Sequence, residues 1–144
     1  MQNCPLCRSD LAPIIATSPY WRLILNHNQN FLGKCFLVLQ RHTETIIELT
    51  PDEWNDLYQQ ITRSTRMLVV AFSPDHFNYA FLQNQDRHVH LHIVPRYASQ
   101  RIFIEQPFVD SDYPAHYSVP APSRTLPLRE FTALATYLHK CFEN

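Results

Sequence analysis

Three histidines at alternating positions are the residues of this chain best suited to chemistry. Residues 88–94 read His-Val-His-Leu-His-Ile-Val, so His88, His90 and His92 follow the two-residue period of a β-strand. This period predicts that the imidazoles lie on one face of a strand while the apolar side chains between them pack into a core. An imidazole, with an ordinary pKa of about 6.5, can act near neutral pH as a nucleophile, an acid or base, or a metal ligand. The spacing favours a reactive or metal-binding row over a polar edge strand without function.

The four cysteines, Cys4, Cys7, Cys35 and Cys141, are too few and too unevenly spaced for a disulfide framework in a chain of 144 residues. Cys4 and Cys7 have the C-x-x-C spacing that is typical of half of a metal site. The N-terminus is therefore a second candidate for chemistry.

The composition predicts one catalytic domain over residues 1–144. The chain is 45% hydrophobic, and its net charge of -1 argues against a protein that grips long nucleic acid or an anionic membrane. There is no long apolar run and no leader with a cleavage site, so we expect a soluble protein of the cytoplasm. The one glycine, Gly33, cannot build a glycine-rich phosphate loop, which excludes a Walker or Rossmann nucleotide site.

The elements that must position these groups begin with two strands. Residues 20–25 alternate and are rich in aromatic and branched side chains, which predicts a strand that ends at Asn26. Residues 35–39 form a second, almost wholly apolar strand after a turn at Gly33. We expect these two strands to form an antiparallel pair.

A strong helix start follows at Thr50. Thr50 can cap the helix, Pro51 suits its first position, and Glu53 can close a capping box, so we expect a helix that ends before Pro74. The apolar stripe that we expect in the core is Trp54, Leu57, Tyr58, Ile61, Leu68 and Phe72.

The remaining elements complete an α+β domain. Strands are expected over residues 78–83 and through the histidine row, with Pro95 closing the second of them. Residues 98–126 show no period, and we expect their carboxylates, Glu105, Asp110 and Asp112, to be solvated. A last helix is expected from about Leu128 to Phe142. This order predicts two helices and a mainly antiparallel sheet.

The histidine run and the residues before it resemble the histidine triad (HIT) family of nucleotidyl hydrolases and transferases. The run from His88 to Val94 matches the family's alternating signature without a gap. Asn26 precedes Gly33 by seven residues, as the family's ribose-contacting Asn or Asp precedes its glycine. The match covers roughly residues 4 to 97. It implies a HIT-like fold and cleavage at the α-phosphate of a nucleoside phosphoramidate or a dinucleoside polyphosphate.

The resemblance also implies roles for individual residues. His90 would be the nucleophile that forms a nucleotidyl-histidine intermediate, and His92 would contact the phosphoryl oxygens or hold His90 in its reactive tautomer. Asn26 would bind the ribose, Asn84 the phosphate, and Gln85 would donate near the leaving group. A homodimer and a small-molecule nucleotide substrate are further implications.

Two positions depart from the family's pattern. Lys34 stands where the family commonly has a histidine, and Gln83 stands where it has a glycine. A lysine can neutralise phosphate charge, but it cannot orient His90 through an imidazole hydrogen bond. These departures keep open a second hypothesis, a non-catalytic nucleotide-binding adaptor or sensor.

Part of the family also has a zinc site, whose positions correspond here to Cys4, Cys7, His42 and His88. Two thiolates and two imidazoles with no vacant position form a structural zinc site. A rival hypothesis is a metal-dependent hydrolase, in which the histidine row itself holds a catalytic metal. The two hypotheses differ in whether His90 is a metal ligand.

Overall fold

The computed structural model describes residues 4–8, 10 and 13–144. Its centre is an antiparallel sheet of five strands in the order β1-β2-β3-β5-β4. The strands are β1 (Ile14–Thr17), β2 (Trp21–Leu25), β3 (Cys35–Leu39), β4 (His76–Ala80) and β5 (His90–Arg96), with a separate hairpin of β6 (Arg101–Phe103) and β7 (Gln106–Phe108). The helices are α1 (Pro51–Phe72) and α2 (Leu128–Glu143), and short 3-10 turns lie at Pro5–Cys7 and Ile46–Glu48. The predicted α+β class is confirmed.

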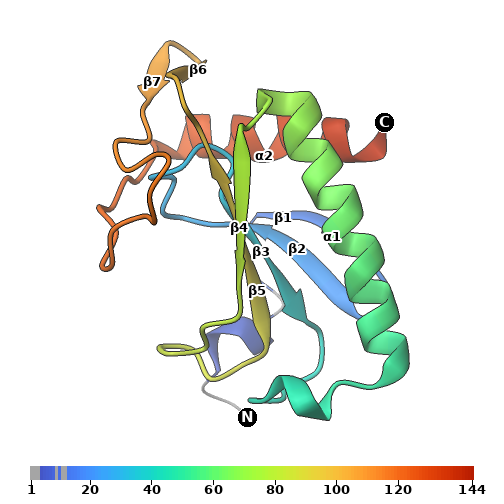
Figure 1. Cartoon of the computed structure of the whole chain (residues 1–144). Helices are drawn as coiled ribbons and strands as arrows, with labels where there is room; N and C mark the ends of the chain where they lie inside the picture. The colour runs from blue at the N-terminus through green and yellow to red at the C-terminus, as the bar shows by residue number, and fades with distance from the viewer. Residues whose placement is uncertain (1–3, 9, 11–12) are drawn as a thin grey trace.

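The two faces of the sheet carry different residues. β3 pairs with β5 in a register that sets Leu37 opposite Leu91 and Val38 opposite His90. Leu37 and Leu91 belong to the main core, into which both helices pack, whereas Val38 lies in a smaller cluster with Leu6. Figure 1 shows α1 on one side of the sheet and the orange segment that follows β7 on the other. His90 is therefore on the face that the helices leave open.

Helix α1 begins as the sequence predicts. The Thr50 hydroxyl accepts a hydrogen bond from the backbone N–H of Glu53, and the Glu53 carboxylate accepts one from the N–H of Thr50. Leu57 is buried as expected, but Trp54 and Tyr58 are 42% and 72% exposed because they share a flank of the helix that the sheet does not cover. Within the described part of the chain, no helix is long and apolar enough to span a membrane.

The boundaries of β4 and β5 differ from the predicted ones. β4 ends at Ala80 rather than 83, and Gln83 has a left-handed backbone with a φ of 51°. β5 begins at His90 rather than His88, since a hydrogen bond from the N–H of His88 to the carbonyl of Asp86 forms a turn there. The first histidine of the row therefore precedes the strand.

Residues 98–126 are more ordered than the sequence predicts. They contain the β6–β7 hairpin, whose turn holds Glu105 at a φ of 61°. Asp110 is buried in an ion pair with Arg96 instead of being solvated. Pro95 does not close β5, which continues to Arg96, and the four-residue strand β1 was also missed. Strands of three or four residues are too short to show a period.

Candidate active site and metal centre

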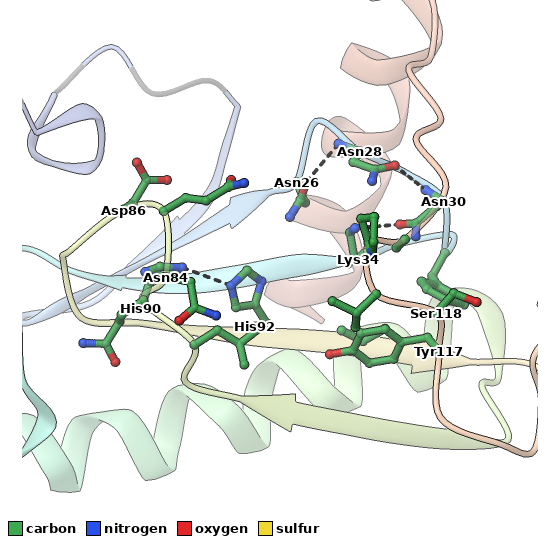
Figure 2. Close-up of a pocket in the computed structure, with 18 residues that line it drawn as sticks. Asn26, Asn28, Asn30, Lys34, Asn84, Asp86, His90, His92, Tyr117 and Ser118 are labelled. Atoms are coloured by element: carbon green, nitrogen blue, oxygen red, sulfur yellow. Dashed lines mark hydrogen bonds between the residues drawn. The ribbon is translucent and has the colours of Figure 1, made fainter.

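An open cleft of about 410 Å³ lies on the helix-free face of the sheet. It is formed where the turn between β2 and β3 meets β5, the loop before β5 and residues 117–121. The cleft contains all six residues that the sequence analysis assigned to catalysis and nucleotide binding, namely Asn26, Lys34, Asn84, Gln85, His90 and His92. Figure 2 shows the two histidines on one strand with Asn26 and Lys34 beside them.

The hydrogen bonds of His90 determine which of its nitrogens can react. Nδ1 lies 2.7 Å from the carbonyl oxygen of His88, and a carbonyl can only accept, so Nδ1 carries the proton. In the uncharged ring Nε2 then has a free lone pair. Nε2 lies 3.0 Å from Nε2 of His92, and the one proton of that contact must come from His92. The unprotonated Nε2 of His90 therefore lies in the cleft and accepts a hydrogen bond from the N–H of His92.

Electrostatics keep His92 neutral and place one buried cation in the cleft. Burial lowers the pKa of His92 to about 4, and repulsion from the nearby His90 and Lys34 side chains in their protonated forms adds to that shift. Burial also lowers the pKa of Lys34 to about 8, so most of this side chain is still charged at neutral pH. Its Nζ donates to the side-chain oxygen of Asn30 at 2.6 Å, and no carboxylate of the described residues pairs with it. An ammonium group without a counter-ion suits a phosphate.

The buried side chain of Gln29 holds the turn that carries Asn26 and Lys34. Its amide nitrogen donates to the carbonyls of Asn26 at 2.7 Å and Lys34 at 2.8 Å, and its oxygen accepts from the N–H of Gly33 at 2.9 Å. All the polar atoms of a fully buried amide are thus used within one turn. Gln29 was not predicted, because a single glutamine in a polar stretch carries no sequence signal.

Gly33 fits this turn for two reasons. Its φ of 84° is one that residues with a side chain rarely adopt, and a Cβ at this position would lie 2.7 Å from Cδ2 of Leu68 on α1. The turn therefore packs directly against the helix on the far side of the sheet.

The loop before β5 keeps a glycine-like conformation without a glycine. Gln83 has a φ of 51°, and its side-chain amide donates to the backbone carbonyl of Glu44. A left-handed backbone costs an ordinary residue about 1 to 2 kcal/mol. Gln83 replaces the family's glycine, but its backbone keeps the left-handed conformation that a glycine adopts easily.

The four predicted metal ligands form one cluster. The Sγ or Nδ1 atoms of Cys4, Cys7, His42 and His88 all lie within 4.8 Å of one another. The shortest separations are 3.2 Å between the two Nδ1 atoms and 3.4 Å from each sulfur to one of them. A tetrahedral zinc ion with bonds of about 2.0 to 2.3 Å needs ligand atoms roughly 3.3 to 3.8 Å apart. The donor set and its spacing fit zinc.

The protonation of His88 also fits a metal ligand. Its Nε2 lies 2.7 Å from the carbonyl oxygen of Leu39 and must donate to it, which leaves Nδ1 unprotonated and facing the cysteines. Burial lowers the pKa of His88, which further favours the neutral ring. Because the His88 ring belongs to this cluster, it does not join the His90 and His92 rings in a three-histidine set, as the rival metal-dependent hydrolase requires. Among the described residues, no other group of three or more side chains has metal-ligand spacing.

Other residues of the cleft were missed by the sequence analysis. Asn28, Asn30 and Phe31 come from the polar turn, Asp86 comes from the loop before β5, and residues 117–121 form the wall opposite that loop. The wall lies in the segment without a period, so no local pattern could have placed it at the cleft.

Comparison with known proteins rests on structures. No family model and no curated protein sequence matches the chain. A histidine triad protein from Marinobacter aquaeolei VT8 is 18% identical, with a TM-score of 0.75 over 94% of each chain. A histidine triad protein from Bradyrhizobium japonicum is 21% identical, with a TM-score of 0.73 over 89% of this chain and 88% of its own.

A third solved structure bears on the cysteine and histidine cluster. It is a Zn-bound histidine triad family protein from Mycobacterium smegmatis, 19% identical, with a TM-score of 0.68 over 99% of this chain and 94% of its own. At these identities the likeness concerns the fold, and it extends over nearly the whole chain. The chain therefore has the fold of the histidine triad proteins.

Proposed function

We propose that the protein transfers a nucleoside monophosphate group from a phosphoramidate or a dinucleoside polyphosphate to water or another acceptor through His90. The observation that carries this proposal is the hydrogen bond from Nδ1 of His90 to the carbonyl of His88. It holds the ring in the tautomer whose free Nε2 lies in the cleft, and a neutral imidazole with that lone pair is a competent nucleophile.

The reaction balances as two displacements at phosphorus. In the first, Nε2 of His90 forms a bond to the α-phosphorus, the bond from phosphorus to the leaving group breaks, and an amine leaving group departs with a proton from water. The Nδ1–H bond to the His88 carbonyl then stabilises the positive ring. In the second, water attacks phosphorus and the bond to His90 breaks. The proton that the attacking water loses neutralises the hydroxide left by the first step, and the nucleoside monophosphate is released.

Each of the other cleft residues contacts a different part of the nucleotide. The Lys34 ammonium pairs with the phosphate charge. The Nε2–H of His92, which donates to Nε2 of His90 in the free protein, turns to a phosphoryl oxygen when the nucleotide binds. Asn84 and Gln85 are on the loop beside His90, where their amides can donate to the phosphate and the leaving group. Asn26 is at the end of β2, where its side chain can pair with ribose hydroxyls.

The cysteine and histidine cluster has a structural role in this proposal. When bound there, zinc would have four protein ligands and no open position for a substrate, so it would supply folding energy and not Lewis-acid chemistry. Cys4 and Cys7 would tie the N-terminal segment to His42 and His88.

Trapping the intermediate tests the proposal. The protein is mixed with adenosine phosphoramidate labelled at phosphorus, quenched with acid, neutralised at once and mapped by peptide mass spectrometry under conditions that preserve phosphoramidates. We expect the nucleotidyl group on His90. Tight binding of AMP without turnover or adduct would instead favour the adaptor or sensor, and an adduct on another residue would contradict the mechanism.

A further inference from the structure

The C-x-x-C turn is held by a buried arginine of the sheet. The guanidinium of Arg22, on β2, donates from Nη2 to the carbonyl of Leu6 at 2.6 Å and from Nη1 to the carbonyl of Arg8 at 2.9 Å. These two carbonyls flank Cys7. Arg22 therefore fixes the backbone on both sides of a cysteine of the cluster.

The turn has little support of its own. It is a 3-10 turn of three residues, Pro5–Cys7, closed by two backbone hydrogen bonds of 3.1 and 3.3 Å. A single turn of this kind fixes several dihedral angles for few hydrogen bonds, so it does not persist alone. Its attachments to the sheet are the burial of Leu6 against Ile24 and Val38 and the two bonds from Arg22.

The register of the sheet explains why Arg22 lies under this turn. Arg22 is opposite Val38, and Val38 is opposite His90, so the three side chains share the helix-free face. Arg22 is 9% exposed there and is not among the residues that line the cleft. Its contacts therefore serve the metal-type cluster and not the nucleotide.

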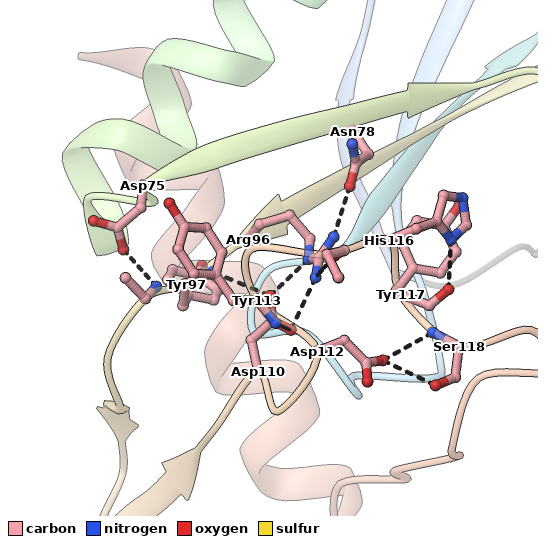
Figure 3. A network of polar contacts seen from close by, with 12 residues as sticks. Asp75, Asn78, Arg96, Tyr97, Asp110, Asp112, Tyr113, His116, Tyr117 and Ser118 are labelled. Carbon is pink, nitrogen blue, oxygen red and sulfur yellow. Dashed lines mark hydrogen bonds and ion pairs between the residues drawn. The ribbon is translucent and has the colours of Figure 1, made fainter.

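The positive charge of Arg22 has no acidic partner. Arg96, the other buried arginine of the described chain, donates to both carboxylate oxygens of Asp110, at 2.6 and 3.1 Å (Figure 3). None of the described carboxylates forms an ion pair with Arg22, and its Nε is buried without a hydrogen-bond partner among the described residues. Burial of a charge without a counter-ion destabilises a fold. Such an exception to the packing rules is typical of a residue with a function.

The shape of a guanidinium suits this position. Its planar fork donates to two acceptors at once, whereas a lysine ammonium is a point charge on a flexible stem. The turn that it holds sets the sulfur atoms of Cys4 and Cys7 each 3.4 Å from an Nδ1 atom of a histidine, which fits zinc. A C-x-x-C segment that already has this shape loses little conformational entropy when it binds a metal.

We propose that Arg22 is a positioning residue of the metal centre, which holds the C-x-x-C turn in its ligating shape and thereby strengthens zinc binding and slows zinc release. Arg22 acts through the backbone of Leu6 and Arg8 and is not itself a ligand. The inference rests on the zinc-binding role proposed for the cluster and is independent of attack by His90.

Zinc binding by a matched set of variants tests this role. The zinc dissociation constant is measured by competition with a chelating dye in wild type, Arg22→Met, Arg22→Lys and Arg66→Met, and zinc release is followed after addition of excess chelator. Arg66 is exposed on α1, so Arg66→Met controls for the loss of an arginine as such. Melting temperatures of the metal-free and the zinc-saturated proteins show whether an effect reaches the whole fold.

We expect Arg22→Met to weaken zinc binding by about 10- to 100-fold, the scale for groups that orient metal ligands, and to speed up zinc release. Its melting temperature should fall more in the zinc-saturated than in the metal-free protein, because the lost affinity removes stability only when zinc is bound. Arg22→Lys should recover part of the affinity, since an ammonium also donates to carbonyls but lacks the planar fork. Arg66→Met should match wild type.

Three results would contradict the inference in different ways. Wild-type zinc affinity in both Arg22 variants would overturn it and leave the zinc site standing. An equal fall of the two melting temperatures at unchanged zinc affinity would give Arg22 a purely structural role, which also makes the inference wrong. Wild-type protein that binds no zinc would refute the zinc role itself, while the trapping experiment on His90 would still decide nucleotidyl transfer separately.

Discussion

The backbone carbonyl of His88 accepts a hydrogen bond from Nδ1 of His90 at 2.7 Å, while the ring of His88 faces Cys4 and Cys7. His88 therefore belongs to the cysteine and histidine cluster through its ring and contacts the reactive His90 through its backbone. A change in the cluster reaches the His90 ring through a single residue, so loss of a metal should affect reactivity as well as stability.

His90→Ala should abolish turnover of adenosine phosphoramidate, because it removes the attacking atom. Losses of this kind amount to several powers of ten. His92→Ala should cost less, roughly a hundredfold, since it removes a donor and not the nucleophile. Steady-state kinetics measures both, with AMP calorimetry to verify an intact cleft. Near wild-type turnover by His90→Ala would end the nucleotidyl-histidine mechanism.

Cys4→Ser should lower the zinc content and the thermal stability together, because metal binding at a closed site is coupled to folding. Protein purified without chelator should contain about one zinc per chain by elemental analysis. Cys141→Ser is the matched control, because Cys141 lies outside the cluster. Wild-type protein that is free of zinc and keeps its stability in a strong chelator would rule the site out.

The pH dependence of AMP binding should report on Lys34. Its pKa of about 8 is below the ordinary 10.5, so the ammonium that attracts phosphate is lost as the pH rises above about 8. Wild-type affinity should fall above that pH by about tenfold, the scale of a charge-assisted hydrogen bond. Lys34→Met should bind weakly and without this pH step, and Lys140→Met, on α2, should behave as wild type. An identical step in Lys34→Met would assign the titration to another group.

The same pKa has the opposite consequence for folding. The pKa of Lys34 is about 8 in the folded protein and 10.5 in the unfolded chain, because burial disfavours the charged ammonium. Below pH 8 this burial destabilises the folded state to its full extent. The destabilisation is lost as the pH rises from about 8 to 10.5. The Lys34→Met variant should therefore be more stable than wild type at pH 7, with the difference shrinking at higher pH in urea unfolding.

Gln29→Ala should weaken AMP binding although Gln29 is not among the cleft-lining residues. The substitution leaves the carbonyl of Asn26 and the N–H of Gly33 without the Gln29 amide, at about 1 to 3 kcal/mol for each group that water cannot reach. The carbonyl of Lys34 loses one of its two donors and keeps the backbone N–H of Asn26. Urea unfolding should show a loss of about 3 kcal/mol. Gln59→Ala, on the exposed face of α1, is the control, and equal effects of the two would contradict the role of Gln29.

Asp110→Asn should loosen the wall of the cleft. It removes the negative charge opposite Arg96, and breaking a buried pair costs about 3 to 5 kcal/mol. Limited proteolysis should then cut within residues 110–121 faster than in wild type. Asp52→Asn, in the exposed first turn of α1, should leave the cleavage pattern unchanged.

The parts of the fold that the sequence predicted are those with dense local signals. Thr50 and Glu53 are three residues apart and form the predicted capping box, and β2 and β3 are the predicted antiparallel pair. The alternating histidines predicted the cleft, because the two-residue period of a strand can be recognised without knowing which distant residues pack against it. The first of these histidines was misplaced, since the turn before β5 depends on backbone bonds that leave no pattern in side-chain types.

The parts that were missed depend on contacts between residues far apart in the chain. Arg96 and Asp110 are in no motif, and the partner of Arg96 could have been any acid of the following segment. Gln29 forms its hydrogen bonds with three backbone groups, and backbone groups are the same in every sequence, so no residue pattern reveals the contact. Tyr117 reaches the cleft only because Asp110 and Asp112 fold its segment back onto the sheet.

The contact between Gly33 and Leu68 makes helix α1 a mechanical support for the turn that carries Lys34. A Cβ at Gly33 would lie 2.7 Å from Cδ2 of Leu68, so the turn packs closely against the inner face of α1. The position of Lys34 over the cleft is then set from the opposite side of the molecule. Substitutions that repack the inner face of α1 should change affinity for phosphate without touching any group that meets the ligand.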